Sequence, residues 1–424
     1  MGKLLADLTP LRESRDFRAL YGGQLVSFLG SQLTVVAVPL QVFQLTHSSL
    51  QVGLVSLAQL GPLIVGSLLG GSIADAYDRR RLLILMQVLL ALTSAGLALN
   101  AMSGHAALWP LYVVTSLAAG FSGIERPARA AAVPSVVSRD HLPAAYALWQ
   151  ILLQVGAVAG PALAGILVGT VGLASVYWID VATFAAAFAA AVAIRPLPPV
   201  GGGTKVGFAS VAEGLGYLRG RRVLIGTFLI DINAMVFGMP RAVFPALGYN
   251  FFHGGASTVG LLYAAPGAGA LIGAVFTGWV SGVRRQGRAV IIAVVVWGAA
   301  IALFGLVPLL PLALVLLAIA GAADVVSAVF RNTILQTTVP DELRGRLSAV
   351  HIAVVTGGPR LGDAEAGAAA AVSAPFAVVS GGVASVVGAL LLAWRLPEFA
   401  RYDTGTIAEM VSNDAHAGAG SEPA

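Results

Sequence analysis

The sequence predicts an all-α membrane protein with twelve transmembrane helices, arranged as two parallel six-helix repeats around a central cavity. Three observations lead to this fold class. The chain is 57% hydrophobic and only 11% charged, whereas soluble domains carry about 25% charged residues. Apolar runs of spanning length follow one another along almost the whole chain. The second half also repeats marker residues of the first half.

The first half, residues 1–195, begins with a basic tail and is expected to form one bundle. It contains six apolar runs, each of about the length of one membrane span. These runs cover residues 19–45, 50–74, 82–102, 107–128, 142–169 and 174–195. A polar stretch rich in Gly and Pro, residues 196–222, follows as a cytoplasmic linker.

The second half, residues 223–396, is expected to form the second bundle. Its six apolar runs cover residues 223–247, 257–281, 288–308, 311–332, 346–370 and 375–395. The remaining segment, residues 397–424, is small and polar towards its end, and it is predicted to be a disordered cytoplasmic tail.

The positions of the basic residues predict the orientation. All of the 25 Lys and Arg residues except Arg241 and Arg360 lie in the tails or in every second turn between the runs. Such residues stay on the cytoplasmic side of a membrane. Both termini are therefore expected in the cytoplasm, with an even number of spans. The richness in Arg, Ala and Gly suggests a bacterial source, and hence the inner membrane.

Composition also excludes several classes of function. The net charge of +5 comes from short clusters between apolar runs, not from the continuous basic patch of a nucleic-acid-binding protein. The chain has no Cys, and its six His are scattered, so no disulfide, metal site or cofactor is expected. No phosphate-binding glycine loop or hydrolase motif is present. An ATP-driven pump and an enzyme are therefore not expected.

The two halves are in register over an offset of about 206 residues, which indicates parallel repeats. Parallel repeats are typical of transporters whose two halves rock about a central site. Chance similarity of apolar sequence is the alternative. The matching positions are Pro39 with Pro245, Val52-Gly53-Leu54 with Val259-Gly260-Leu261, and Gly71 with Gly278.

The turn after the second run, Gly70–Arg81, resembles a signature of the major facilitator superfamily. Its Gly, its Asp four residues later and its basic cluster match that signature, while Tyr77-Asp78 stands where a glycine is expected. This variant is similar to the branch that holds the enterobactin exporter and the macrolide efflux proteins. The resemblance implies a cytoplasmic gate. Its residues would be Gly71, Asp75, Arg79, Arg80 and Arg81, with Glu125 and Arg129 at the end of the fourth run.

A glycine-rich motif in the fifth run resembles the antiporter motif of proton-coupled exporters. Its residues are Gly156, Gly160, Pro161 and Gly165. Ordinary packing of small residues between membrane helices is the alternative interpretation. Within the superfamily, the motif favours export over import.

Charged and polar residues inside the apolar runs are the candidate site, because a charge in hydrocarbon costs at least ~3 kcal/mol. Asp231 and Asp324 lie in spans seven and ten, which line the cavity in the superfamily. They are the preferred proton-coupling residues; the alternative is a fixed ion pair with Arg241 or Arg331. Asp180 and Asp363 are further coupling candidates. The expected cavity residues are Gln24, Ser31, Gln32, Arg241 and Arg331, although the three on span one would equally well bond neighbouring helices.

The expected function is a proton-coupled secondary exporter of a medium-sized amphipathic molecule. By resemblance, the substrate is a siderophore such as enterobactin. The alternatives are a macrolide or multidrug efflux antiporter and a non-transporting membrane sensor. The expected partners are the substrate, protons and the lipid bilayer, with no nucleic acid, and the chain is expected to be a monomer.

Overall fold

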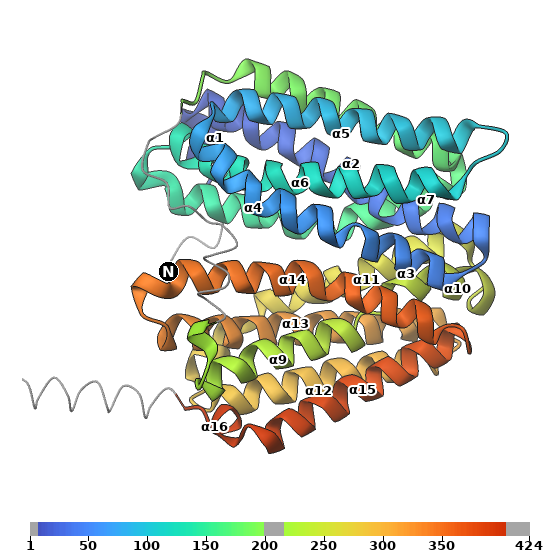
Figure 1. The fold of residues 1–424 in the computed structure, drawn as a ribbon, viewed down its shortest axis with the longest axis vertical. Helices are drawn as coiled ribbons and strands as arrows, with labels where there is room; N and C mark the ends of the chain where they lie inside the picture. Colours follow the sequence, from blue (N-terminus) through green and yellow to red (C-terminus); the bar gives the residue numbers. More distant parts are fainter. Residues whose placement is uncertain (1–6, 199–215, 404–424) are drawn as a thin grey trace, which may run out of the picture.

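The computed structural model describes residues 7–198 and 216–403, and these residues fold into two helical bundles that lie side by side (Figure 1). The first bundle contains α1 (Thr9–Glu13), α2 (Arg15–Thr46), α3 (Ser49–Ala58), α4 (Leu60–Ala76), α5 (Arg79–Met102), α6 (Leu108–Val136), η1 (Arg139–His141) and α7 (Leu142–Ala193). The predicted all-α membrane fold is confirmed.

The second bundle begins after the linker. It contains α9 (Arg222–Phe237), η2 (Arg241–Val243), α10 (Phe244–Ala246), η3 (Leu247–Phe251), α11 (Gly255–Val275), η4 (Thr277–Gly282), α12 (Gln286–Phe304), α13 (Leu310–Thr338), α14 (Asp341–Ala369), α15 (Ala374–Arg395) and α16 (Pro397–Ala400).

Short polar residues start several of these helices. The Ser14 hydroxyl accepts a hydrogen bond from the backbone N–H of Phe17, and Ser48 and Ser373 cap α3 and α15 in the same way. The Asp78 carboxylate accepts from the backbone N–H of Arg81 at 3.2 Å and caps α5. Each cap satisfies an N–H group that the helix itself leaves unpaired.

Nine helical stretches in the described ranges are long and apolar enough to cross a membrane. One of them, Arg139–Ala193, is 55 residues long and contains two of the predicted spans, which meet at Gly172. Gly172 has φ 81°, a backbone conformation that favours glycine, and it turns the chain between the two spans. Helices α6 and α14 carry several charges and are not among the nine. The count of twelve spans therefore stays a prediction for these two helices.

The seventh span is broken in its middle. Helix α9 ends at Phe237, and Gly238 and Pro240 separate it from η2, which begins with Arg241. The indole N–H of Trp297 donates to the Gly238 carbonyl at 2.9 Å, so a backbone acceptor released by the break has a partner. The break places Arg241 at the first position of η2, partly buried and in the middle of the span.

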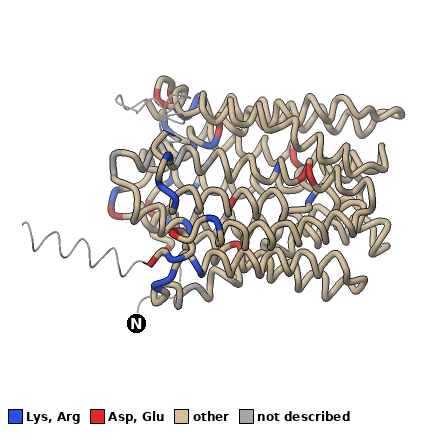
Figure 2. The backbone as a smooth tube through the Cα atoms, turned by 60° about the horizontal axis from the view of Figure 1, so that its bottom comes forward, with Lys and Arg blue, Asp and Glu red and all other residues tan. Residues whose placement is uncertain are grey.

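Most Lys and Arg positions along the backbone gather at one end of the molecule, near the N-terminus (Figure 2). We call this the basic end; helices α5, α7 and α12 begin there (Figure 1), with Arg79–Arg81, Arg139 and Arg285 at or just before their first residues. A smaller group of charges lies deeper along the helices (Figure 2). This distribution is the one that the positive-inside pattern predicts, and the cytoplasmic placement of the basic end stays a prediction.

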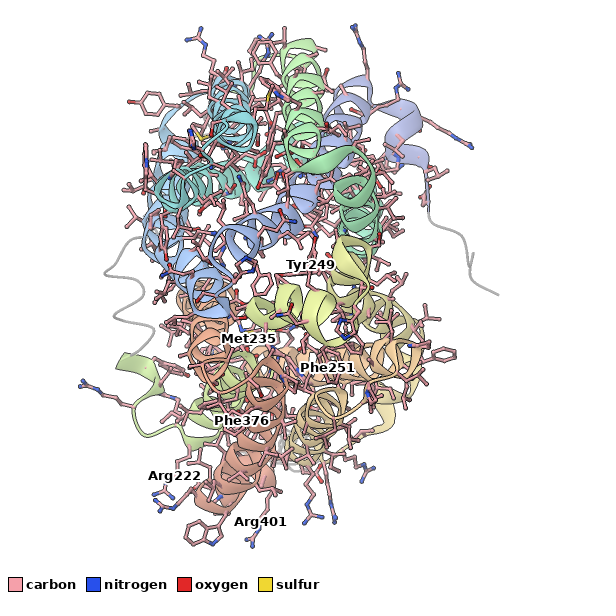
Figure 3. All side chains as sticks on the ribbon, turned by 90° about the vertical axis from the view of Figure 1, so that its right-hand side faces the viewer. Arg222, Met235, Tyr249, Phe251, Phe376 and Arg401 are labelled. Carbon is pink, nitrogen blue, oxygen red and sulfur yellow. The ribbon has the colours of Figure 1, made fainter. Side chains whose placement is uncertain are left out.

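The two bundles touch each other mainly in the half of the molecule away from the basic end. Helix α7 packs on α11, and α3 packs on α14. At the α7–α11 contact, a Cβ atom on Gly165 would lie only 2.8 Å from the Cα of Gly260. Figure 3 views this end and shows Tyr249 at the junction of the bundles, where its hydroxyl accepts from Gln44 Nε2 at 3.1 Å.

The chain remains folded past the last predicted span. Helix α16 follows α15 directly, Phe399 is fully buried, and its ring lies against Gly226 of α9. The predicted disordered tail, residues 397–424, therefore needs correction at its start, because residues 397–403 belong to the second bundle. Its remainder, residues 404–424, and linker residues 199–215 lie outside the described residues.

Candidate functional site

A buried cluster in the second bundle joins two carboxylates through one guanidinium. Arg331 Nη2 on α13 lies 2.9 Å from Asp231 Oδ1 on α9 and 3.8 Å from Asp324 Oδ1 on its own helix. Arg331 Nη1 also donates to the Ser327 hydroxyl at 2.6 Å. The side chain of Asp231 is 1% exposed, whereas that of Asp324 is 32% exposed. The alternative interpretation, an ion pair with Arg331, is therefore observed for Asp231 at 2.9 Å, and Asp324 is the looser and more accessible member of the cluster.

A second cluster lies where spans seven and eleven meet the first bundle. The Asp363 carboxylate on α14 accepts hydrogen bonds from the Ser56 hydroxyl of α3, at 2.5 Å, and from the Ala242 backbone. Arg241 and Arg360 both lie near enough to attract this carboxylate. Arg126 of α6 in turn lies near enough to Arg360 for the two cations to repel each other. Two arginines therefore lie near the Asp363 carboxylate at the contact between the bundles, and Arg126 lies near one of them, Arg360.

The possible Arg360–Asp363 pair within α14 is not formed among the described residues. Arg360 Nη1 instead donates to the Thr356 carbonyl of its own helix at 2.7 Å. The Asp363 carboxylate bonds the Ser56 hydroxyl of the first bundle. Arg360 therefore has no carboxylate within ion-pair distance in the described part of the chain.

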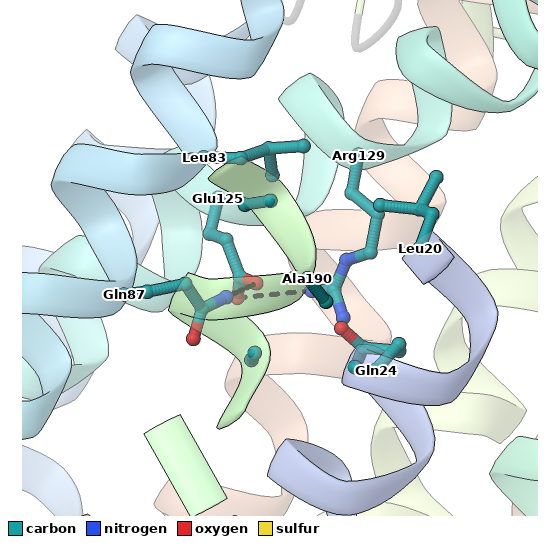
Figure 4. Close-up of a pocket in the computed structure, with 10 residues that line it drawn as sticks. Leu20, Gln24, Leu83, Gln87, Glu125, Arg129 and Ala190 are labelled. Atoms are coloured by element: carbon teal, nitrogen blue, oxygen red, sulfur yellow. Dashed lines mark hydrogen bonds and ion pairs between the residues drawn. The ribbon is translucent and has the colours of Figure 1, made fainter. Parts of the chain in front are cut away.

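The first bundle contains a third polar cluster, around Glu125 and Arg129 on α6. Their carboxylate and guanidinium lie 3.0 Å apart, and Gln87 Nε2 of α5 donates to Glu125 at 2.9 Å (Figure 4). This ion pair forms between residues four apart on α6, despite Pro127 between them. The pair borders a cavity of about 20 Å³, which Gln24 of α2 also lines. That volume holds about one water molecule, so it is no substrate site.

Asp180 lies apart from these clusters, buried in the first bundle. Its Oδ2 accepts hydrogen bonds from Thr34 and Ser94, both at 2.7 Å, and its Oδ1 accepts from Thr183 at 3.3 Å. Within the described ranges it has no cationic partner. Three hydroxyl donors from three different segments make Asp180 a link between α2, α5 and α7.

Two arginines of the Gly70–Arg81 turn bond neighbouring helices at the basic end. Arg80 donates to the carbonyls of Ala191 and Val192, the last turn of α7. Arg79 is buried and donates to the Ser135 hydroxyl at 3.4 Å. Asp75, by contrast, is half-buried and forms no hydrogen bond or ion pair with any described residue. The structure thus places Arg79 and Arg80 in structural contacts and leaves the Asp75 carboxylate available.

The glycines of this turn differ in their surroundings. A Cβ on Gly70 would lie 2.7 Å from the Cα of Ile124, so Gly70 permits the close contact of α4 with α6. A Cβ on Gly71 would meet nothing within 4 Å. The side chain of Arg81 is exposed, and its backbone N–H donates to the Asp78 carboxylate. Gating roles for Gly71, Asp75 and Arg81 stay predictions.

The antiporter-like motif packs α7 against two partners. Gly156 faces the Phe28 ring and Gly160 faces the Gln32 side chain, both on α2. Gly165 faces α11 of the other bundle, and Pro161 contributes its carbonyl to that contact with Gly260. Two of the expected cavity residues on span one are therefore bound locally, since Gln32 packs on Gly160 and the Ser31 hydroxyl donates to the Ser27 carbonyl at 2.9 Å.

Three polar residues of these clusters were not predicted: Gln87, Ser56 and Ser327. Each lies inside an apolar run and bonds a buried charge. The spacing of Ser327, four residues before Arg331, was the clearest signal, because residues four apart share a helix face.

Comparisons with known proteins agree on one family. A profile of transmembrane secretion effectors matches residues 5–417. The enterobactin exporter EntS of Citrobacter koseri is 30% identical over 399 residues, which cover 94% of this chain and 96% of that protein. EntS of Shigella boydii serotype 18 is 31% identical over 390 residues, which cover 92% and 94% of the two chains.

Solved structures with the same fold are transporters. The nucleoside transporter NupG, as its D323A mutant, superposes with a TM-score of 0.73 at 12% identity, over 91% of this chain and all of that one. A D-xylose–proton symporter superposes with a TM-score of 0.69 at 14% identity, over 90% and 97%. At these identities the likeness shows the fold alone.

Proposed function

This chain belongs to the transmembrane secretion effectors of the major facilitator superfamily, and we propose that it exports an anionic siderophore from the bacterial cytoplasm in exchange for protons. It is a multi-pass membrane transporter rather than an enzyme. The observation that carries the choice of substrate is the group of Arg241 and Arg360 near Asp363, with Arg126 near Arg360. The relatives named as enterobactin exporters support the same choice.

The central cluster favours an anionic ligand. Arg126, Arg241 and Arg360 carry three positive charges. Asp363 attracts Arg241 and Arg360, Asp324 also attracts Arg241, and Glu125, which is paired with Arg129, attracts Arg126. Arg126 is exposed, and Arg360 has no carboxylate within ion-pair distance among the described residues. Guanidinium groups bind planar oxygen anions through paired hydrogen bonds. A catecholate ligand offers such oxygen pairs, whereas a cationic drug would be repelled.

Proton coupling is assigned to Asp324. Arg331 is paired at 2.9 Å with Asp231. When Asp324 takes up a proton, Arg331 therefore keeps an ionised partner. Low dielectric disfavours the ionised form of a carboxylate, which allows such a group to bind a proton. Asp324 also keeps the accessibility that proton exchange needs. Asp231 acts in this proposal as the fixed partner that holds Arg331 in place.

The arrangement of the bundles fits the cytoplasm-facing state of the cycle. Their described contacts lie in the half away from the basic end, and the basic end is the predicted cytoplasmic side. In this state the cytoplasmic gate is open, which accounts for an Asp75 without a described partner. Closure of the gate would bring Asp75 to a partner, and the contacts at Gly165 and Gly260 would separate.

Export from everted membrane vesicles tests this proposal. The vesicles are energised by respiration and offered radiolabelled enterobactin or the macrolide erythromycin, with and without a protonophore, and vesicles lacking the protein serve as the reference. We expect enterobactin to accumulate and the protonophore to abolish its accumulation. Accumulation of erythromycin alone would replace the siderophore by a drug, and accumulation that survives the protonophore would remove proton coupling.

Replacing Arg360 by Gln is expected to raise the KM for enterobactin by about tenfold or more, because a hydrogen bond to a charged group contributes ~1.5–3 kcal/mol. Arg360→Lys keeps the charge but loses the paired geometry, and we expect it to recover part of the affinity. Arg401→Gln removes an exposed arginine at the other side of the second bundle and is the matched control. An unchanged KM for Arg360→Gln would exclude this residue from the substrate site.

Replacing Asp75 by Asn is expected to slow turnover severalfold while the protein still reaches the membrane in normal amount. The carboxylate has no described partner to lose, so stability should change little. Asp78→Asn is the control, because that carboxylate caps α5 and any loss there is structural. Normal turnover in Asp75→Asn, measured in the same vesicles, would exclude a gating role for this carboxylate.

A further inference from the structure

A long apolar groove lies on the surface of the second bundle, between α12 and α13, in the half nearest the basic end. Its volume is about 570 Å³. Apart from Arg285 and Arg288, every residue that lines it is apolar. Four alanines form a narrow floor between larger side chains: Ala289, Ala293, Ala322 and Ala323. Small residues at these positions leave space that a long, thin apolar ligand fills.

The groove faces away from the partner bundle and into the membrane. Ile292, Val296 and Ile319 border it and are 63%, 42% and 43% exposed. These residues belong to helices that are long and apolar enough to span a bilayer. In the membrane, such exposed side chains contact lipid rather than water. The groove is therefore open to the acyl chains of the leaflet at the basic end.

The two arginines stand at the end of this groove where a lipid headgroup would lie. Both are exposed, and they lie three residues apart at the start of α12, so they share one helix face. Neither side chain forms a hydrogen bond or an ion pair with another described residue. Two arginines so placed present a fork of donors that suits a phosphate group.

We propose that this groove is a binding site for one anionic phospholipid of the adjacent leaflet. One acyl chain lies over the alanine floor, and the phosphate binds Arg285 and Arg288. A second copy of the chain fits the groove less well. A symmetric contact would place the arginines of both copies at the same interface, where their charges repel.

Native mass spectrometry of the full chain in detergent tests the site. The delipidated protein is titrated with phosphatidylglycerol or with phosphatidylcholine of the same acyl chains. We expect one phosphatidylglycerol to bind well before phosphatidylcholine does. A cation near an anionic lipid surface contributes about fivefold to binding, so Arg285→Gln with Arg288→Gln should weaken the first phosphatidylglycerol by roughly 30-fold.

Two further variants complete the design. Arg12→Gln with Arg139→Gln removes two exposed arginines at the basic end of the first bundle and should leave binding unchanged. Ala289→Phe fills the groove while keeping both arginines, and it should also weaken the first phosphatidylglycerol. Equal binding of the two lipids, or unchanged binding in the Arg285/Arg288 double variant, would overturn the proposal. A dimer mass that Ala289→Phe abolishes would assign the groove to a second copy instead.

Discussion

Replacing Asp324 by Asn is expected to abolish uphill export while the exchange of labelled for unlabelled substrate continues. The variant keeps the shape of the side chain and the 2.9 Å pair of Arg331 with Asp231, so the bundle should stay folded. It removes only the carboxylate to which we assign the proton. One proton that crosses a membrane potential of 100 mV supplies about 2.3 kcal/mol, which sustains a substrate concentration ratio of about 50-fold across the membrane. The variant should not build up this substrate gradient.

The neighbouring carboxylate provides the contrast. Asp231→Asn leaves Arg331 with a carboxylate only at 3.8 Å, and loss of one partner from a buried ion pair costs ~3–5 kcal/mol. We expect this variant to lower the amount of folded protein and the exchange rate together. Glu365→Gln, also in the second bundle but outside both clusters, is the matched control. Uphill export by Asp324→Asn at the level of the control would move proton coupling to another residue.

Replacing Gly260 by Leu is expected to reduce export at least tenfold by blocking the contact of α11 with α7. A Cβ at this position would lie 2.7 Å from the Cα of Gly165, in a contact that buries both helices. Overfilling a packed contact costs ~1–3 kcal/mol, which shifts a two-state equilibrium by about 5- to 150-fold. The variant should therefore favour the state in which this contact is open.

Cysteine labelling measures that shift directly, because the chain has no Cys of its own. Ser49→Cys introduces one thiol at the α3–α14 contact, where Ser49 is buried beside Gly367. A membrane-impermeant maleimide should label this thiol slowly, and faster when Gly260→Leu is added. Gly61→Leu adds the same side chain at an exposed position of α4 and should change neither labelling nor export. Equal labelling in all three would show that the contact does not control access.

The fold was largely predictable because apolar length and the distribution of arginines each carry a direct physical constraint. The runs end where charges would enter hydrocarbon, and helices begin within a few residues of those points, as at Ser14 and Asp78. The break at Gly238 was not predicted. Gly238 and Pro240 are residues that interrupt helices, and the Gly238 carbonyl bonds the indole N–H of Trp297, 59 residues away.

The candidate site was predictable in its residues but not in its partners. Asp231, Asp324 and Arg331 are conspicuous because charges are costly inside a span. Pattern alone left Asp231 open to pairing with Arg241 or Arg331, since both lie in apolar surroundings. Likewise, Asp363 lies only three residues from Arg360 on α14, yet it bonds Ser56 across the bundle contact. Such choices depend on how the helices are rotated about their axes, which composition does not determine.

The contacts that Phe399 and Tyr402 make with α9 and α13 have a consequence for biogenesis. Phe399 lies against Gly226 at the start of the second bundle, and the Tyr402 hydroxyl is 2.8 Å from that of Thr337 on α13. Gly226 leaves the ribosome about 170 residues before Phe399, which is a delay of some ten to thirty seconds at ordinary rates of synthesis. During that time the surface of α9 around Gly226 is not yet packed against Phe399. Assembly of this half is therefore completed only after residues 399–402 have been synthesised, and a chain shortened to residue 396 should be a substrate for membrane quality-control proteases.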